Sequence, residues 1–268
     1  NYFYIKSSHN TYLRADLDRG VNLTTNRNEW ERWTPWPSSK DSITTIITTC
    51  CRKNAPDNSI ILENIRHLIK YSPLLTKNIV IVFDGGEVLN NNLDGKCRDR
   101  CNINNYNIYI NKTIEQIKNL LPVSNLIFKI MPERSCLTAS LKAGIQEAST
   151  EFINIMQEDL ILKKSFDVSA VIKSIKENKR IDIIRYDCGI NNNYFVLCPD
   201  KFDNFKKEIL KINGLTLSKS NQYCDQCQIT TKEFYNTHIF PNTDNYSFME
   251  HTLICEVGDK LPETIWHL

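Results

Sequence analysis

The run from Ser42 to Thr49 (Ser-Ile-Thr-Thr-Ile-Ile-Thr-Thr) is β-branched at almost every position and carries no charge. β-Branched side chains favour extended backbone, and an uninterrupted run of them is typical of a strand buried on both faces. Such strands occur in parallel sheets, where neighbouring strands are joined by a crossover connection that is usually a helix. The run therefore predicts an α/β fold.

The segments that follow Thr49 alternate between the two periodicities of helix and strand. Apolar residues at helical spacing predict helices over Ile60–Tyr71, Asn111–Leu121 and Leu137–Ala148, the first capped by Asp57-Asn58-Ser59. Short apolar runs predict strands over Asn78–Phe83, Leu126–Ile130 and Phe152–Met156. Repeated strand–helix–strand units imply a Rossmann-like, mostly parallel central sheet flanked by helices.

Residues 1–37 have a different pattern, in which short strand-like segments are separated by turn formers. The strands are expected at Phe3–Lys6, Tyr12–Ala15, Val21–Thr24 and Trp30–Thr34. This stretch resembles one repeat of a fascin-like β-trefoil, through its Tyr-Leu-Arg-Ala and Trp-Glu-Arg-Trp sequences. We therefore expect a small β-rich segment at 1–37, followed by one α/β domain at 38–268.

Composition excludes several classes of protein. The formal net charge of +2 gives no electrostatic reason to bind nucleic acid, and no apolar run is long enough to cross a bilayer. The chain is apolar enough (41%) to fold without disulfides, so its ten cysteines are expected to be reduced thiols of a soluble, cytoplasmic protein. Two close pairs, Cys97 with Cys101 and Cys224 with Cys227, leave a zinc site or disulfides open. Richness in Asn, Ile and Lys suggests an AT-rich genome, cellular or viral.

Three well-known site motifs are absent. The chain has no Gly-x-Gly-x-x-Gly after its first buried strand, no Gly-x-x-x-x-Gly-Lys-Ser/Thr and no Gly-x-Ser-x-Gly. These absences argue against a dinucleotide-binding Rossmann domain, a P-loop nucleotidase and an α/β-hydrolase.

Ligands of parallel sheets bind beyond the carboxyl ends of the strands, so the residues just after each strand are candidates for a site. Acidic residues follow two of the strands: Asp84 follows one, and Glu158 and Asp159 follow another. The remaining candidates at these positions are Thr48, Thr49 and Cys50.

In this order the segments resemble the GT-A glycosyltransferases, and residues 42 to 185 carry the resemblance. The shared features are a β-branched strand ending in Thr-Thr-Cys, a strand ending in Phe83-Asp84-Gly85, and a helix preceded by Pro132-Glu133-Arg134. The last strand leads into Gln157-Glu158-Asp159, where the family has its Asp-x-Asp motif; this DxD-like motif departs at its first position. The resemblance implies that Asp159 binds Mn²⁺ or Mg²⁺ and that Glu158 supports it, since hard cations prefer carboxylate oxygens.

The resemblance also implies roles in binding a nucleoside-diphosphate sugar. Asp84 would bind the base or ribose, and because a carboxylate can accept the imide N–H of uracil or thymine, a UDP or dTDP donor is favoured. Arg134 and Lys142 are candidate partners of the phosphates. Thr48, Thr49 and Cys50 would line the nucleotide pocket.

The C-terminal part would supply the acceptor side of the site. An acid near the start of a late helix deprotonates the acceptor hydroxyl in inverting members of this fold, and Glu250 is the preferred base, with Asp187 in reserve. A late histidine closes over the metal in some relatives, and His267 would take that role.

We therefore expect a metal-dependent, hexosyltransferase-like enzyme that moves a sugar from its nucleotide to a hydroxyl group of a glycan or protein. Inversion is favoured because direct displacement needs one base and no enzyme nucleophile. Two alternatives stay open: a retaining transferase, and a non-catalytic module that binds carbohydrate or protein.

Overall fold

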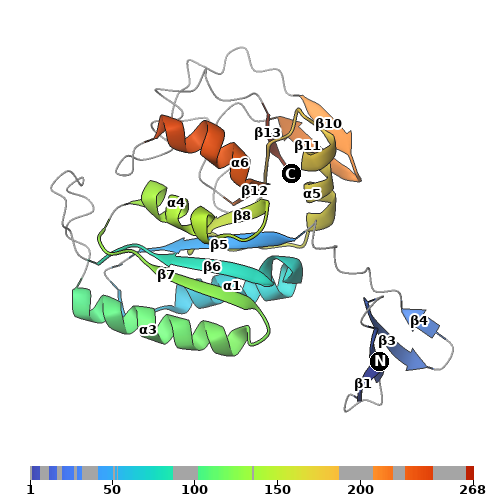
Figure 1. Ribbon diagram of the computed structural model, residues 1–268, viewed down its shortest axis with the longest axis horizontal. Helices are drawn as coiled ribbons and strands as arrows, with labels where there is room; N and C mark the ends of the chain where they lie inside the picture. Colours follow the sequence, from blue (N-terminus) through green and yellow to red (C-terminus); the bar gives the residue numbers. More distant parts are fainter. Residues whose placement is uncertain are drawn as a thin grey trace. The chain divides into compact units, whose positions relative to one another are not determined.

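The computed structural model (Figure 1) describes residues 42–50, 52, 54–86, 102–134, 136–186, 208–219, 227–243 and 264–268 in full, and the backbone of four strands before residue 42. The chain divides into two compact units, Asn1–Ser42 and Ile43–Leu268.

The first unit is a four-stranded antiparallel sheet. Its strands are β1 (Tyr2–Lys6), β2 (Tyr12–Asp16), β3 (Gly20–Asn26) and β4 (Glu29–Glu31). Each strand pairs with the next one along the chain, so the sheet is the short meander that the turn formers predict. The resemblance to a trefoil repeat stays a prediction.

The second unit is built on a nine-stranded sheet in the order β10-β11-β13-β9-β12-β8-β5-β6-β7. Strands β7, β6, β5 and β8 are parallel, while β12 runs antiparallel between β8 and β9. The bounds are β5 (Ile43–Thr49), β6 (Asn78–Phe83), β7 (Asn125–Ile130), β8 (Phe152–Gln157), β9 (Ile183–Arg185), β10 (Ile209–Ile212), β11 (Leu215–Lys219), β12 (Gln228–Thr231) and β13 (Ile265–His267).

Helices cover both faces of this sheet (Figure 1). On one face lie α1 and α3, and on the other lies α4, which packs across β5 and β6. The helical segments are α1 (Ser59–Tyr71), η2 (Pro73–Thr76), α3 (Ile103–Leu120), α4 (Leu137–Glu147), α5 (Val168–Glu177) and α6 (Lys232–Phe234), which continues through η5 (Tyr235–Ile239) and η6 (Phe240–Asn242).

The alternation of side chains along each strand creates two cores. On β6, Ile79, Ile81 and Phe83 join the core with α1 and α3, whereas Val80 and Val82 join the core with α4. All five are at most 1% exposed, and burial of each such side chain contributes about 1.5–3 kcal/mol. The predicted double-sided burial of β5 and β6 is confirmed.

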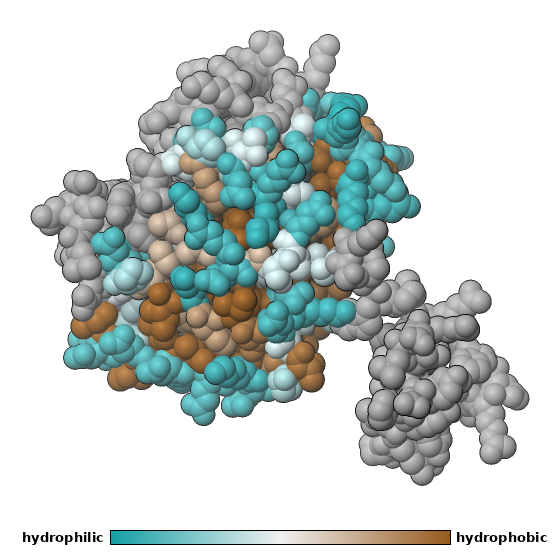
Figure 2. Space-filling view, in the orientation of Figure 1, coloured by the Kyte–Doolittle hydropathy of each residue, from teal (hydrophilic) through white to brown (hydrophobic). Residues whose placement is uncertain are grey.

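The edge strand β7 is less covered than its neighbours. Figure 2 shows apolar residues gathered over this part of the molecule. Leu126, Ile127 and Phe128 are only partly buried, and Ile130 is 52% exposed. The centre of the sheet, two strands away, is therefore better shielded from water than this edge.

The strand order produces a switch point between β5 and β8. From β5 the chain passes outward to β6 and β7, and then returns to place β8 on the other side of β5. The chain therefore moves along the sheet in opposite directions on the two sides of β5, and ligands of open α/β sheets bind beyond the carboxyl ends of the strands at such a point. The loop after β8 begins there, with the Glu158 N–H donating to the Thr48 carbonyl at 3.1 Å.

One helix begins earlier than the sequence predicts. Helix α3 starts at Ile103, not at Asn111, and the Asn102 side chain caps it by accepting a hydrogen bond from the Asn105 N–H at 3.1 Å. Its added turns bury Tyr106 and Tyr109 against the sheet. The prediction was wrong because this Asn-rich segment has low helix propensity, which packing of the two tyrosines overrides.

Candidate functional site

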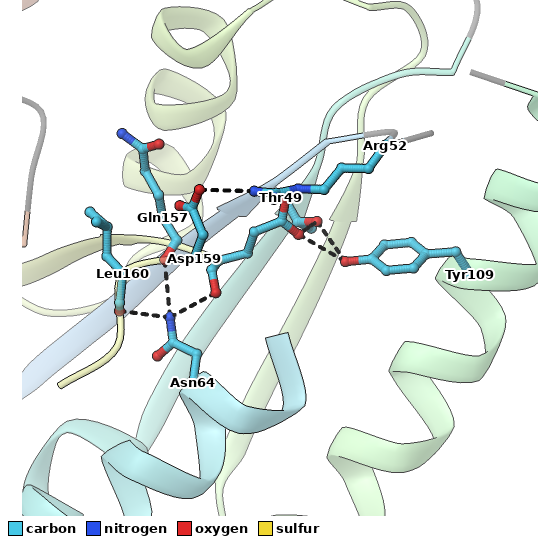
Figure 3. A network of polar contacts seen from close by, with 8 residues as sticks. Thr49, Arg52, Asn64, Tyr109, Gln157, Asp159 and Leu160 are labelled. Atoms are coloured by element: carbon cyan, nitrogen blue, oxygen red, sulfur yellow. Dashed lines mark hydrogen bonds and ion pairs between the residues drawn. The ribbon is translucent and has the colours of Figure 1, made fainter. Parts of the chain in front are cut away.

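The carboxylate of Glu158 lies at the switch point and is buried, with only 3% of the residue exposed. Its Oε1 accepts a hydrogen bond from Arg52 Nε at 2.5 Å. Its Oε2 accepts from the Tyr109 hydroxyl at 3.0 Å and from Thr49 Oγ1 (Figure 3). A buried carboxylate needs such partners to offset its lost hydration, so Glu158 is anchored within the chain.

The two hydroxyl groups on Glu158 also touch each other, with 2.7 Å between Thr49 Oγ1 and the Tyr109 oxygen. Each carries a single proton, so Tyr109 donates either to Glu158 or to Thr49, which in turn donates to Glu158. Burial and then the Glu158 charge raise the pKa of Tyr109 far above its usual range. The phenol therefore stays protonated and keeps its proton available to this network.

Asp159 follows Glu158 but faces solvent, with 44% of its side chain exposed. Its Oδ2 lies 3.1 Å from Arg52 Nη2, so Arg52 contacts both acids of the pair. Burial lowers the pKa of Arg52, but the charges and hydrogen bonds of Glu158 and Asp159 outweigh it and raise the net pKa above its usual value. Arg52 is therefore a permanent internal cation of the site.

A buried asparagine on α1 holds the loop that carries these acids. Asn64 is 0% exposed, and its Nδ2 donates to the carbonyls of Gln157, Glu158 and Leu160 at 3.0, 3.2 and 3.0 Å. Figure 3 shows the amide facing all three. Its Oδ1 has no hydrogen-bond partner in the described structure, which costs about 1–3 kcal/mol. The asparagine thus fixes the loop backbone at the expense of one of its own polar atoms.

The end of β6 is held through its backbone. The Asp84 N–H donates to the Thr49 carbonyl at 2.9 Å, and the Asp84 carbonyl accepts from the Tyr106 hydroxyl at 2.7 Å. The Gly85 N–H donates to Asp84 Oδ1 at 3.0 Å and to the Glu133 carbonyl at 3.2 Å. A Cβ on Gly85 would lie 2.0 Å from the Glu133 carbonyl carbon, so only glycine allows this approach.

Arg134 follows this contact and is buried, at 4% exposed. Its Nη1 has no hydrogen-bond partner within the described part of the chain. Its charge reaches Cys50: burial and Glu158 raise the pKa of that thiol to about 11, while Arg52 and Arg134 oppose the rise. Arg134 directly follows Glu133, whose carbonyl bonds the Gly85 N–H at the end of β6, and its unpartnered N–H suits an anionic ligand. Cys136, two residues on, has φ 85°, a left-handed conformation that costs a non-glycine residue about 1–3 kcal/mol.

The remaining predicted residues are more distant or lie outside the described residues. Lys142 is exposed on α4, with its Nζ 6.0 Å from the centre of the Phe240 ring. His267 ends β13, which runs parallel to β8 and reaches the same edge of the sheet, but β9 and β12 lie between them. Asp187 and Glu250 lie outside the described residues, as do Cys97, Cys101 and Cys224.

The metal ligands that the protein offers at this site suit a cation that takes most of its ligands from a bound phosphate and from water. Within the described ranges, no three His, Cys, Asp or Glu residues gather to hold a metal ion. The exposed Asp159 offers one hard oxygen ligand, and Mg²⁺ or Mn²⁺ at a nucleotide commonly needs only one or two protein carboxylates besides phosphate and water. The site therefore fits a cation that arrives with a diphosphate.

Three residues of the site were not predicted: Arg52, Asn64 and Tyr109. A signal existed for Asn64, because it interrupts the apolar face formed by Ile61 and Ile65 on the same helix. Arg52 lies just beyond the first strand's carboxyl end, where ligands bind. Tyr109 was hidden by the late predicted start of its helix.

No protein-family model and no curated protein match this sequence. Among solved structures, the chain matches S. aureus TarS 1–349 with TM-score 0.51 and 14% identity, covering 85% of this chain and 58% of that one. TarS 1–349 in complex with UDP-GlcNAc matches with TM-score 0.51 and 12% identity, covering 85% and 56%. The chain therefore spans little more than half of the TarS fragment.

A third match is the mannosyltransferase PcManGT from Pyrobaculum calidifontis in complex with GDP-Man and Mn²⁺, at TM-score 0.45 and 13% identity, covering 88% of this chain and 60% of that one. A score this low adds nothing to the fold assignment, which depends on TarS. These neighbours are GT-A-like glycosyltransferases.

This chain has the GT-A fold.

In the ranges that the structure describes, no helix combines the length and the apolar character needed to cross a bilayer.

Proposed function

We propose that this chain is a metal-dependent glycosyltransferase of the hexosyltransferase type, which moves a sugar from a UDP- or dTDP-sugar to a hydroxyl group of a glycan or protein. The observation that carries the proposal is Asp159: a half-exposed carboxylate on a clamped loop, at the switch point of a GT-A sheet. The TarS complex with UDP-GlcNAc supports a nucleotide-sugar as the donor.

Asp159 would hold Mn²⁺ or Mg²⁺, with oxygens of the donor diphosphate and water as the other ligands, and His267 is a further proposed ligand. When bound, the cation would neutralise the negative charge that develops on the leaving diphosphate. Glu158 supports this arrangement through its bond to Arg52, since its buried oxygens already have partners within the chain.

Donor recognition is proposed for residues at the ends of β5 and β6. Asp84 would accept the imide N–H of the base, and its position is supported by the backbone bonds that hold it. Arg134 and Lys142 would pair with the phosphates; the unpartnered Nη1 of buried Arg134 supports its role. The pocket would be lined by Thr48, Thr49 and Cys50.

Glu250 is proposed as the base that deprotonates the acceptor hydroxyl, with Asp187 as the alternative. Direct displacement with a single base inverts the anomeric carbon, so inversion is the expected stereochemistry. The catalytic domain is proposed to span 38–268, with the β-rich segment at 1–37 as an appended unit.

The test is Mn²⁺-dependent hydrolysis and transfer with a panel of UDP- and dTDP-sugars. Asp159→Ala is expected to lower turnover at least about a hundredfold, because a bound cation contributes several kcal/mol of transition-state stabilisation. The matched control is Glu63→Ala, which removes an exposed acid of α1.

Turnover that survives Asp159→Ala would remove the metal assignment. Nucleotide binding without turnover of any donor would favour the non-catalytic binding module over a transferase. A retained anomeric configuration in the product would replace inversion with the retaining alternative.

A further inference from the structure

Arg52 joins the two acids of the site through two contacts of different character. Its Nε lies 2.5 Å from Glu158 Oε1, and that carboxylate side chain is 4% exposed. Its Nη2 lies 3.1 Å from Asp159 Oδ2, on a side chain that is 44% exposed. Breaking a buried ion pair leaves an uncompensated charge, whereas a solvated pair contributes little. The inner contact is therefore durable and the outer one exchangeable.

The inner contact is also reinforced by its surroundings. Glu158 Oε2 is held by the Tyr109 and Thr49 hydroxyls, so its carboxylate keeps a fixed orientation toward Arg52. The backbone carbonyl of Glu158 is held in turn by Asn64. Rotating the Arg52 guanidinium group while Nε stays on Glu158 therefore costs less free energy than displacing the Glu158 carboxylate.

The outer contact occupies one of the two carboxylate oxygens that Asp159 could offer to a divalent cation. A cation on the Asp159 carboxylate would lie within a few ångströms of the Arg52 Nη2, and the two positive charges would repel each other. An incoming diphosphate removes this conflict, because its oxygens attract both the cation and the guanidinium group.

We propose that Arg52 is a donor-dependent latch on the metal site. Without nucleotide, its outer nitrogen pairs with Asp159 and disfavours cation binding. When a nucleoside diphosphate enters, its phosphate oxygens take over the Arg52 Nη2, and Asp159 is released to the cation, while Arg52 Nε stays on Glu158. The latch assumes the proposed function, and it makes nucleotide and metal bind cooperatively.

The experiment measures Mn²⁺ binding by electron paramagnetic resonance, with and without UDP, and subtracts the Mn²⁺ held by UDP alone. In the wild-type protein, Mn²⁺ is expected to bind at least about tenfold more tightly when UDP is present, within the usual range of coupling between two sites. Arg52→Gln is expected to bind Mn²⁺ about tenfold more tightly than wild type without UDP, and to show a smaller increase in Mn²⁺ affinity on adding UDP, because only the contribution of the diphosphate's own oxygens remains.

Two variants and one control accompany this measurement. Arg52→Lys keeps a charge near Glu158 but lacks the planar fork whose Nε and Nη2 contact the two acids separately, so it is expected to bind Mn²⁺ more tightly than wild type without UDP, even if Arg52→Gln folds poorly. Asp159→Asn is expected to abolish Mn²⁺ binding both with and without UDP. Arg66→Gln, which removes an exposed arginine of α1, is expected to leave binding unchanged.

The outcomes separate the two levels of the hypothesis. If Asp159→Asn abolishes binding but neither Arg52 variant binds Mn²⁺ more tightly than wild type, the latch is overturned and the metal site stands. If Asp159→Asn has no effect on Mn²⁺ binding, the proposed metal site itself fails, and the latch with it.

Discussion

The two sides of the site satisfy their charges in different ways. At the carboxyl ends of β5 and β8, both acids contact Arg52, and the buried Glu158 has further hydroxyl partners. Beyond β6, the buried Arg134 keeps an Nη1 without a hydrogen-bond partner among the described residues. The charges of the first side are neutralised by partners within the chain, whereas on the second side a buried N–H donor has no such partner among the described residues.

This difference suggests a division of labour. A buried polar atom without a partner destabilises the folded state, and a bound ion or a catalytic role is one explanation for its retention. The self-neutralised side is expected to control the metal and the local stability, and the Arg134 side to control nucleotide affinity. The three predictions below test this division, from the largest expected effect to the smallest.

Gly85→Ala is expected to have the largest effect, because the added Cβ meets the Glu133 backbone at 2.0 Å and backbone must move. That movement would separate the end of β6 from the segment that carries Arg134. UDP binding, measured by isothermal titration calorimetry, should become undetectable, and the melting temperature should fall.

The control for this prediction is Gly214→Ala in the β10–β11 turn. Gly214 has φ +79° but nothing within 4 Å of its added Cβ, so only conformational strain of about 1–2 kcal/mol is expected, with UDP affinity intact. Wild-type UDP affinity in Gly85→Ala would show that the β6 side does not bind the nucleotide.

Arg134→Met is expected to weaken UDP binding by about 10- to 100-fold, the value of a charge-assisted hydrogen bond of about 1.5–3 kcal/mol. The melting temperature should stay the same or rise, because a buried unpartnered N–H is removed. The matched control is Arg66→Met, which replaces an exposed arginine of α1. A large loss of stability with unchanged UDP affinity would contradict the division, by making Arg134 structural.

Asn64→Ala is expected to weaken Mn²⁺ binding in the presence of UDP by about three- to tenfold, because the loop carrying Asp159 loses its clamp; partners that orient metal ligands are worth about tenfold or more. Its destabilisation should be only about 1–3 kcal/mol, since the unpartnered Oδ1 is also removed. Both quantities are measured on one preparation, by electron paramagnetic resonance and by thermal melting.

The matched control is Asn58→Ala, another buried asparagine of the same region. Among the described residues, its side chain bonds only α3, through Thr113 at 3.2 Å and Gln116 at 2.8 Å. A similar loss of stability without a loss of Mn²⁺ affinity is expected. Equal effects of both substitutions on Mn²⁺ would mean that Asn64 serves the fold alone.

Much of the site's position could be predicted from sequence, and less of its chemistry. The β-branched and apolar runs located β5, β6 and β8, so Asp84, Glu158 and Asp159 were expected at one edge of the sheet, and they are there. The partners of Glu158 were not foreseen. Arg52, Asn64 and Tyr109 come from a loop and two helices, and no local pattern indicates which strand end each one will face.

The sequence by itself determined the local elements of this protein, because side-chain periodicity and β-branching act over a few residues. It thereby determined where the parallel strands β5, β6, β7 and β8 lie along the chain, and that acidic residues follow β6 and β8. Only the tertiary structure decided that β12 runs antiparallel between β8 and β9, and that the last residues form β13. It also decided that Asp159 pairs with Arg52. Strand pairing and charge pairing depend on contacts between distant residues, whose free energy is settled only when the whole sheet is assembled.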